Sequence, residues 1–162
     1  PKEPILEMLP HLPAHERARI EAILHRYESG FAETSELQPG AARAVAGVRE
    51  RGFACALMTR NSRASVGRFL QRHGLGFDLT WTREDGPMKP SPEPVHIICE
   101  RLGAQPARTW VIGDYLYDIQ CGRDAGARTV LVLNNDHRPA WADQADHVIT
   151  CLDELSAILD EV

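Results

Sequence analysis

Residues 109–118 read TWVIGDYLYD, a short apolar run that ends at Gly113-Asp114 and continues into a helical pattern. An apolar run that does not alternate with polar residues is typical of a strand that helices cover on both faces. Segments of about ten residues with helical periodicity separate this run from the other predicted strands at 53–58, 77–82, 128–133 and 147–149. Strands that alternate with helices in this way predict an α/β fold, with a three-layer Rossmann-like parallel sheet.

A long helix is predicted before the first of these strands. It opens near Pro13 and carries one apolar stripe at spacings of four, three and four, formed by Ile20, Leu24, Tyr27 and Phe31. Gln38-Pro39-Gly40 then breaks the helical pattern. We therefore expect two parts, a helical segment at 1–38 and an α/β core at 39–162.

The composition is that of an ordinary globular domain, with 43% hydrophobic and 25% charged residues in a chain of 162. The net charge is -5 and the basic residues are scattered, which argues against a nucleic-acid partner. No apolar stretch reaches the ~18 residues of a membrane helix. The four cysteines have no metal-ligand spacing and are expected to be free thiols. These features predict a protein of the cytoplasm or of an organelle matrix.

Ligands of an open parallel sheet bind outside the carboxyl ends of the strands, so polar residues that directly follow a strand are site candidates. Thr59-Arg60-Asn61 follows the predicted strand at 53–58. The Thr59 hydroxyl and the Asn61 amide could hold a phosphate oxygen, together with N–H groups of the helix that begins near Ser62. The simpler interpretation is that Asn61 or Ser62 only caps this helix.

Lys89 is one of two lysines in a chain that contains sixteen arginines. It lies in the proline-rich segment 86–92, directly before a predicted helix. Because arginine is the general cation of this chain, a lysine here indicates that a compact point charge is needed rather than a planar fork. Such a charge could neutralise a phosphate and a nearby carboxylate. The alternative is a solvated lysine in a stiff turn.

Asp114 follows the predicted strand at 109–112, and Asp118 lies four residues later at the start of the next helix. Carboxylates at this spacing face each other and repel, and a hard cation between them removes the repulsion. Mg²⁺ prefers one or two carboxylates together with water and substrate phosphate oxygens. Asp114 could instead cap the helix, an interpretation that explains Asp118 less well.

The order of Thr59-Arg60-Asn61, Lys89-Pro90 and Gly113-Asp114 with Asp118 resembles motifs II, III and IV of haloacid dehalogenase (HAD) phosphatases. The resemblance covers about residues 38–162. The stretches REDGPMKP at 83–90 and GRDAG at 122–126 resemble the phosphoglycolate-phosphatase-like branch in particular.

This resemblance implies a Mg²⁺-dependent phosphomonoester hydrolase that acts on a small soluble metabolite. It implies that Thr59 and Asn61 bind the transferred phosphoryl group, that Lys89 stabilises its charge, and that Asp114 and Asp118 form the metal site. Arg60 beside them could help to attract an anionic substrate or be an ordinary exposed charge. Residues 1–38 would be the remnant of a small helical cap.

The chain departs from the family at motif I, a strand that ends in Asp-x-Asp and supplies the aspartate nucleophile. No Asp-x-Asp occurs in the 162 residues. In the family this strand lies between the strands predicted here at 53–58 and 109–112. Without a nucleophile, nucleophilic catalysis cannot proceed. We expect the chain alone to be inactive, and to pair with a second copy because sheet edges are left open.

Three interpretations remain at the level of sequence. The leading one is that these residues belong to a longer phosphatase that forms an aspartyl-phosphate. The second is a non-catalytic module that binds phosphate or a phosphorylated metabolite, or serves as an interaction module. The third is a receiver-like domain, which the position of Lys89 ahead of Gly113-Asp114 disfavours, since the lysine of those domains follows a late strand.

Overall fold

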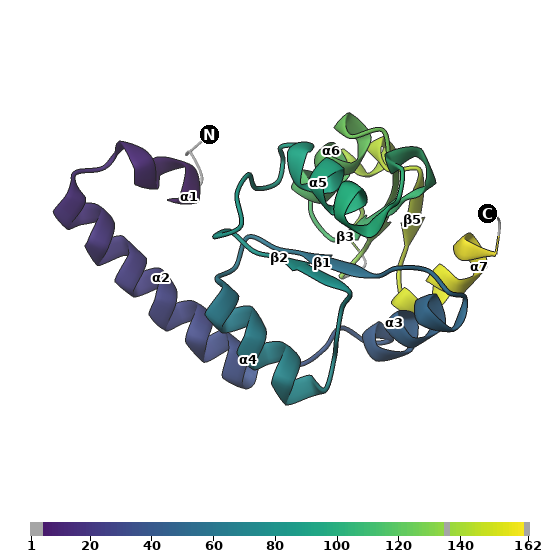
Figure 1. Ribbon diagram of the computed structural model, residues 1–162, viewed down its shortest axis with the longest axis horizontal. Coiled ribbons are helices and arrows are strands. Elements are labelled where there is room, and N and C mark those ends of the chain that lie inside the picture. The colour runs from purple at the N-terminus through teal and green to yellow at the C-terminus, as the bar shows by residue number, and fades with distance from the viewer. Residues whose placement is uncertain (1–4, 135–136, 161–162) are drawn as a thin grey trace.

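The computed structural model describes residues 5–134 and 137–160 (Figure 1). The remaining residues of the two predicted parts, at 1–4, 135–136 and 161–162, lie outside this description. The strands are β1 (Ala56–Met58), β2 (Leu79–Trp81), β3 (Trp110–Gly113), β4 (Arg128–Val132) and β5 (His147–Ile149). All pairings among them are parallel, which confirms the predicted α/β class.

Seven α-helices connect and cover these strands in the described part of the chain. They are α1 (Ile5–Met8), α2 (Ala14–Thr34), α3 (Ala41–Glu50), α4 (Arg63–His73), α5 (Glu93–Leu102), α6 (Leu116–Asp124) and α7 (Leu155–Leu159). Short 3-10 turns complete the connections, at Leu9–His11, Pro106–Arg108, Ala142–Gln144 and Leu152–Glu154. No described helix is long and apolar enough to cross a bilayer.

The strands form two separate sheets, a two-stranded sheet with order β1-β2 and a three-stranded sheet with order β3-β4-β5. The Thr59 N–H bonds to the Trp81 carbonyl of β2, so the backbone groups of Met58 point toward the opposite edge of β1. The Arg128 N–H bonds to the Thr109 carbonyl, so Ile112 of β3 likewise presents its backbone groups away from β4. Among the described residues, no strand pairs with these edges of β1 and β3.

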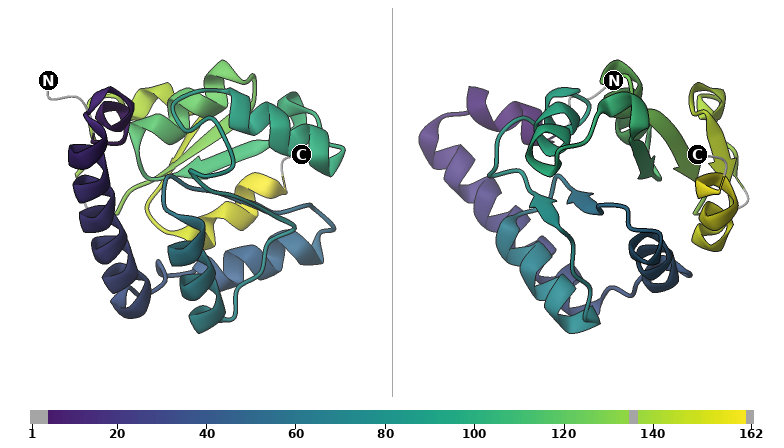
Figure 2. Two further views of the ribbon diagram at one scale, coloured as in Figure 1. Left: turned by 60° about the vertical axis from the view of Figure 1, so that its left-hand side comes forward. Right: turned by 45° about the vertical axis from the view of Figure 1, so that its right-hand side comes forward.

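Helices lie on two sides of the strands (Figures 1 and 2). Helices α5 and α6 cover one side, where they enclose a core cluster formed by Val95, Cys99, Val111, Cys121, Ala125 and Ala127. Helices α3 and α7 pack together on the other side and cover β4 and β5. Helix α4 lies on this second side beneath β1 and β2, and α2 runs beside it (Figure 1).

The helix signals in the sequence explain most of the helix ends. Ser62 caps α4 by accepting a hydrogen bond from the Ser65 N–H, at 3.4 Å. Gly74 ends α4 in the left-handed conformation at φ 63°, which a residue without a Cβ adopts at no steric cost. The long helix predicted near Pro13 begins at Ala14 and ends at Thr34.

The apolar stripe of this long helix is not buried as a unit. Tyr27 and Phe31 remain 63% exposed, and Ile23 beside them is 41% exposed. Ala32 is the one residue of α2 that is fully buried in the described structure. The pattern predicted the helix but not the surface that the helix buries.

The first two strands are shorter than the sequence predicted. The expected strands at 53–58 and 77–82 reduce to Ala56–Met58 and Leu79–Trp81. Within the described residues, β1 pairs with β2 alone, over three residue pairs, and Phe53 before it is 41% exposed. Pairing on one edge only therefore limits the regular length of β1.

Candidate functional site

The Lys89 ammonium joins the two sheets. Its Nζ lies 2.5 Å from Asp118 Oδ1 on α6 and 3.2 Å from the Met58 carbonyl at the unpaired edge of β1. The side chains of Lys89 and Asp118 are 14% and 9% exposed. The solvated surface lysine of the simpler interpretation is therefore wrong, and this cation lies at the carboxyl ends of β1 and β3, where the sequence predicted a site.

Asp118 is fixed by the turn between β3 and α6. Its Oδ2 accepts a hydrogen bond from the Tyr115 N–H at 3.1 Å, which caps the first turn of α6. A Cβ at Gly113 would lie 2.2 Å from Asp118 Cγ, so only glycine leaves room for this carboxylate. The Gly113 and Asp118 pair is thus a packing requirement as well as a chemical motif.

Asp114 also lies at the carboxyl end of β3, but it faces a different partner. Asp114 is exposed, and its Oδ2 accepts a hydrogen bond from the Asn134 amide at 2.5 Å. Asn134 lies two residues after the end of β4 and also accepts a hydrogen bond from Gln38, in the segment between α2 and α3. The sequence reasoning missed Asn134, although the same search for polar residues after each strand would have found it.

Thr59 and Asn61 form a tight turn after β1. The Thr59 hydroxyl accepts a hydrogen bond from the Asn61 N–H at 3.1 Å. Thr59 follows Met58, whose carbonyl Lys89 contacts, so Thr59 and Lys89 belong to one end of the sheet. The Asn61 side chain is exposed and has no hydrogen-bond partner among the described residues. Its amide is therefore available to a ligand.

The first N–H groups of α4 already have acceptors. Ser62 N–H donates to Glu28 of α2 at 3.2 Å, and Arg63 N–H donates to Glu84 at 2.9 Å. Glu28 also forms an ion pair with Arg83. The sequence predicted that N–H groups at this helix start would be available to a phosphate, but two carboxylates accept hydrogen bonds from the first two of them.

Arg60 is a structural link rather than an exposed charge. Its Nη1 donates to the Lys89 carbonyl at 2.8 Å, and its Nη2 lies 2.7 Å from Glu7 of α1. Its guanidinium also lies 5.1 Å from the ring centroid of Tyr117, in the range of a cation–π contact. With its side chain only 19% exposed, Arg60 holds the turn after β1 against the Lys89 segment and α6.

The carboxylates that the sequence predicted for a metal ion are Asp114 and Asp118. No group of three or more metal-ligating side chains occurs among the described residues. Mg²⁺ typically keeps several waters and takes one or two protein carboxylates together with phosphate oxygens. Asp114 is exposed, whereas Asp118 is engaged with Lys89. Asp114 would therefore be the direct ligand of a hydrated Mg²⁺, because both oxygens of Asp118 already accept hydrogen bonds, from Lys89 and from the Tyr115 N–H.

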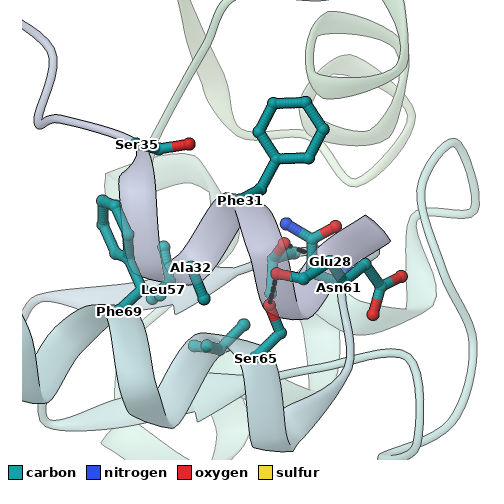
Figure 3. Close-up of a pocket in the computed structure, with 10 residues that line it drawn as sticks. Glu28, Phe31, Ala32, Ser35, Leu57, Asn61, Ser65 and Phe69 are labelled. Carbon is teal, nitrogen blue, oxygen red and sulfur yellow. Dashed lines mark hydrogen bonds between the residues drawn. The ribbon is translucent and has the colours of Figure 1, made fainter. Parts of the chain in front are cut away.

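A cavity of about 360 Å³ opens beside the Thr59 turn (Figure 3). It lies between α2, α4 and β1. Glu28 and Asn61 lie at one end of it and Phe69 at the other, as Figure 3 shows. Its lining is mixed, with apolar side chains from Phe31, Ala32, Leu57, Val66 and Phe69 and polar ones from Glu28, Ser35, Thr59, Asn61 and Ser65.

Cys121 lies near the Lys89–Asp118 pair but does not provide a nucleophile. It is fully buried, and its thiol donates to the Ser91 carbonyl at 2.9 Å. Burial raises the pKa of Cys121 to about 12, and the nearby Lys89 charge opposes this only in part. The thiol therefore stays protonated near neutral pH, and its role is to pack the core.

Comparison with known proteins identifies close similarity to one family. Residues 2–132 match the family model for haloacid dehalogenase-like hydrolases. The chain is 31% identical over 145 residues to N-acetylmuramic acid 6-phosphate phosphatase of Pseudomonas aeruginosa, a match that covers 85% of this chain and 63% of that enzyme. The chain spans between 45% and 66% of the length of four curated relatives.

Solved structures share the fold. A predicted phosphoglycolate phosphatase from Haemophilus somnus superposes with a TM-score of 0.78 at 20% identity, over 91% of this chain and 68% of that one. CbbY from Rhodobacter sphaeroides, in complex with phosphate, superposes with a TM-score of 0.75 at 23% identity, over 93% of this chain and 72% of that one.

Proposed function

Because the chain belongs to the haloacid dehalogenase-like hydrolase family, we propose that it carries the phosphate- and Mg²⁺-handling part of a phosphomonoester hydrolase. The proposed substrate is a small soluble phosphorylated metabolite. The observation that carries the proposal is the Lys89 ammonium, which lies between Asp118 and the strand end that Thr59 follows. The names of the Pseudomonas phosphatase and of the phosphate-bound CbbY structure support the same chemistry.

Each proposed role follows from the position of the side chain. The Thr59 hydroxyl and the Asn61 amide donate hydrogen bonds to phosphoryl oxygens, and Lys89 neutralises the charge that develops on them. Arg60 holds the Thr59 turn against the Lys89 segment. Asp114 holds Mg²⁺ with support from Asp118, and the ion, when bound, screens the charge of the phosphate.

The proposed mechanism needs one more group. The family resemblance assigns the nucleophile to the first aspartate of an Asp-x-Asp, which attacks phosphorus to form an aspartyl-phosphate. The 162 residues contain no Asp-x-Asp. We therefore propose that the intact hydrolase uses an aspartate from outside these residues, and that the 162-residue chain does not turn over substrate by itself.

A second candidate function also follows from the lack of an Asp-x-Asp in these 162 residues. A chain that keeps Thr59, Lys89 and Asp114 but has no nucleophile could serve as a non-catalytic phosphate-binding or interaction module. Both candidates predict phosphate binding by this chain. They differ in whether an Asp-x-Asp segment, supplied to the chain, produces turnover.

The parts of the chain and its partners complete the proposal. Residues 1–38 are proposed as the remnant of a helical cap and 39–162 as the core, in a protein of the cytoplasm or of an organelle matrix.

Ile112 at the unpaired edge of β3 is 37% exposed. We expect this edge to pair with a second copy, so Ile112→Lys should shift the chain from dimer to monomer in sedimentation equilibrium. A wild-type monomer would contradict this.

The binding function is tested with inorganic phosphate and Mg²⁺, followed by ³¹P NMR. Thr59→Val removes a hydroxyl that bonds to a charged group and should weaken phosphate binding by about tenfold or more. Thr80→Val on β2, a half-buried threonine that does not line the cavity beside Thr59, is the matched control and should leave phosphate binding unchanged. Equal effects of the two variants would remove Thr59 from the site.

The proposed inactivity of the 162-residue chain is tested with p-nitrophenyl phosphate and Mg²⁺. The chain alone should release no nitrophenol above background, because the nucleophile is absent. Asp114→Asn should also remove the effect of Mg²⁺ on phosphate binding, and Asp124→Asn at the exposed end of α6 should not. Turnover by the wild-type chain that Asp114→Asn abolishes would overturn the proposed inactivity.

A further inference from the structure

The cavity beside Thr59 has two unlike ends. Thr59 and Asn61, the proposed phosphate ligands, line it together with the aromatic side chains of Phe31 and Phe69 and the aliphatic side chain of Leu57. Phe31 comes from the helical segment and the others come from the core. A ligand whose phosphate binds at Thr59 would therefore place the rest of its structure against these side chains.

We propose that this cavity receives the non-phosphate part of the substrate, and that this part is an aromatic or branched aliphatic group. This inference rests on the proposed function. Small-molecule sites are commonly lined by apolar and aromatic side chains, with a few polar groups that fix orientation. The cavity has this composition, with Glu28 and Asn61 at one end and Phe69 at the other (Figure 3). The apolar wall thus sets the chemical class of the leaving group.

The polar groups of the lining are mostly engaged with each other. The Ser65 hydroxyl donates to the Glu28 carbonyl at 2.8 Å, and the Glu28 carboxylate binds Arg83 and the Ser62 N–H. Among the described lining residues this leaves the side chains of Ser35, Thr59 and Asn61 for a ligand. A sugar-like leaving group would bury hydroxyls without partners, which costs binding energy for each one.

The volume of the cavity and the charge of the leaving group narrow the class of substrate further. About 360 Å³ is near the lower end of the 300–1,000 Å³ that is usual for ligand sites, so a single ring suits it better than a large ligand. The carboxylate of phosphoglycolate would lie against the apolar side chains of Phe31, Leu57 and Phe69, which offer it no hydrogen bond.

Helix α2 offers a matched pair of variants. Phe31 and Tyr27 lie one turn apart and are both 63% exposed, so replacing either with alanine removes little buried surface. Phe31 lines the cavity, whereas Tyr27 does not. Phe31→Ala therefore tests the cavity, and Tyr27→Ala controls for the loss of an exposed aromatic residue from the same helix.

The experiment measures dissociation constants of the full chain for inorganic phosphate, phosphoglycolate and phenyl phosphate by ligand-detected NMR. Phenyl phosphate is expected to bind about tenfold tighter than the other two. Phe31→Ala should reduce this preference by about threefold to tenfold, the usual range for losing one aromatic contact. Tyr27→Ala should leave the preference unchanged.

The two proposals fail in different ways. If inorganic phosphate binds but phenyl phosphate gains nothing, or if phosphoglycolate binds at least as tightly, the inference is overturned and the phosphate site stands. A preference that Tyr27→Ala reduces as much as Phe31→Ala does would also overturn the inference. If the wild-type chain binds none of the three phosphates, the proposed function itself is overturned.

Discussion

The three-stranded half of the molecule and the two-stranded half differ in how completely they are buried. In β4, Val130 and Leu131 are 0% and 1% exposed, and helices cover both faces. All three residues of β1, at 56–58, are only half-buried, and Leu57 lines an open cavity. Within the described residues, β1 and β2 pair only with each other.

The two halves also contribute different residues to the proposed site. The three-stranded half contributes Asp114 and Asp118, which the Asn134 amide and the Tyr115 N–H hold within that half. The two-stranded half contributes Thr59 and Asn61, which are held to the rest of the molecule by contacts of polar side chains, chiefly those of Lys89 and Arg60. We infer that the site is only as well ordered as these links between the halves.

The largest expected loss of stability comes from removing a buried side chain in the three-stranded half. Leu131→Ala removes a side chain that is 1% exposed and should lower the free energy of unfolding by about 4 kcal/mol. Leu57→Ala removes the same atoms from a half-buried position and should cost less than about 2 kcal/mol. Urea denaturation of both variants measures the contrast.

Similar losses in the free energy of unfolding for Leu131→Ala and Leu57→Ala would contradict the difference in burial between the two halves. They would mean that something covers Leu57 in solution. A second copy of the chain would provide such a cover, so the measurement is repeated at several protein concentrations. A cost for Leu57→Ala that grows with concentration would assign the cover to a dimer.

The next effect concerns the link between the halves. Lys89→Met leaves the Asp118 carboxylate, 9% exposed, without its cation, and should lower the free energy of unfolding by about 3 kcal/mol. Replacing both partners, with Lys89→Met and Asp118→Asn together, should recover part of this loss because no buried charge is then unpaired. The double variant therefore distinguishes an unpaired charge from lost packing.

A surface pair provides the control for this variant. Arg43 and Asp153 lie 2.6 Å apart, close to the 2.5 Å of Lys89 and Asp118, but their side chains are 74% and 46% exposed. Arg43→Met should therefore change the stability little, since solvent screens exposed pairs. If Lys89→Met has as small an effect, Lys89 does not hold the two halves together.

The sequence predicted most of the three-stranded half because local signals and tertiary structure agree there. The strand expected at 147–149 is β5 itself, and the one expected at 128–133 is one residue longer than β4. These runs are apolar because helices cover them, which is the condition that the pattern assumes. The strands expected at 53–58 and 77–82 are too long because strand pairing, which the pattern does not record, limits them to three residues each.

The candidate site was predictable to the extent that it depends on strand ends. Lys89 and Asp118 meet as expected, and Asp114 lies at the predicted edge. The role of Arg60 was not predictable, because its partners Glu7 and Tyr117 are distant in sequence. Nor could the sequence show that Glu28 and Glu84 would accept the first N–H groups of α4.

The smallest expected effect tests whether the two halves unfold as one. After β2, Asp85 Oδ2 accepts hydrogen bonds from the Thr82 hydroxyl at 2.6 Å and from the Thr82 N–H at 2.8 Å. These bonds lower the pKa of Asp85 from 3.8 to about 2. A depressed pKa contributes stability that is fully present above about pH 4 and is lost as the pH falls through 2.

Asp85→Asn should therefore lower the free energy of unfolding by about 1 kcal/mol at neutral pH, and this difference should shrink between pH 4 and pH 2. Hydrogen exchange then locates the effect. Faster exchange confined to the amides of β1 and β2 would mean that the two-stranded half opens by itself, as its poor burial suggests. Equal acceleration in β3, β4 and β5 would mean that the Lys89 link makes the halves one cooperative unit, and the difference in burial between them would then have no counterpart in stability.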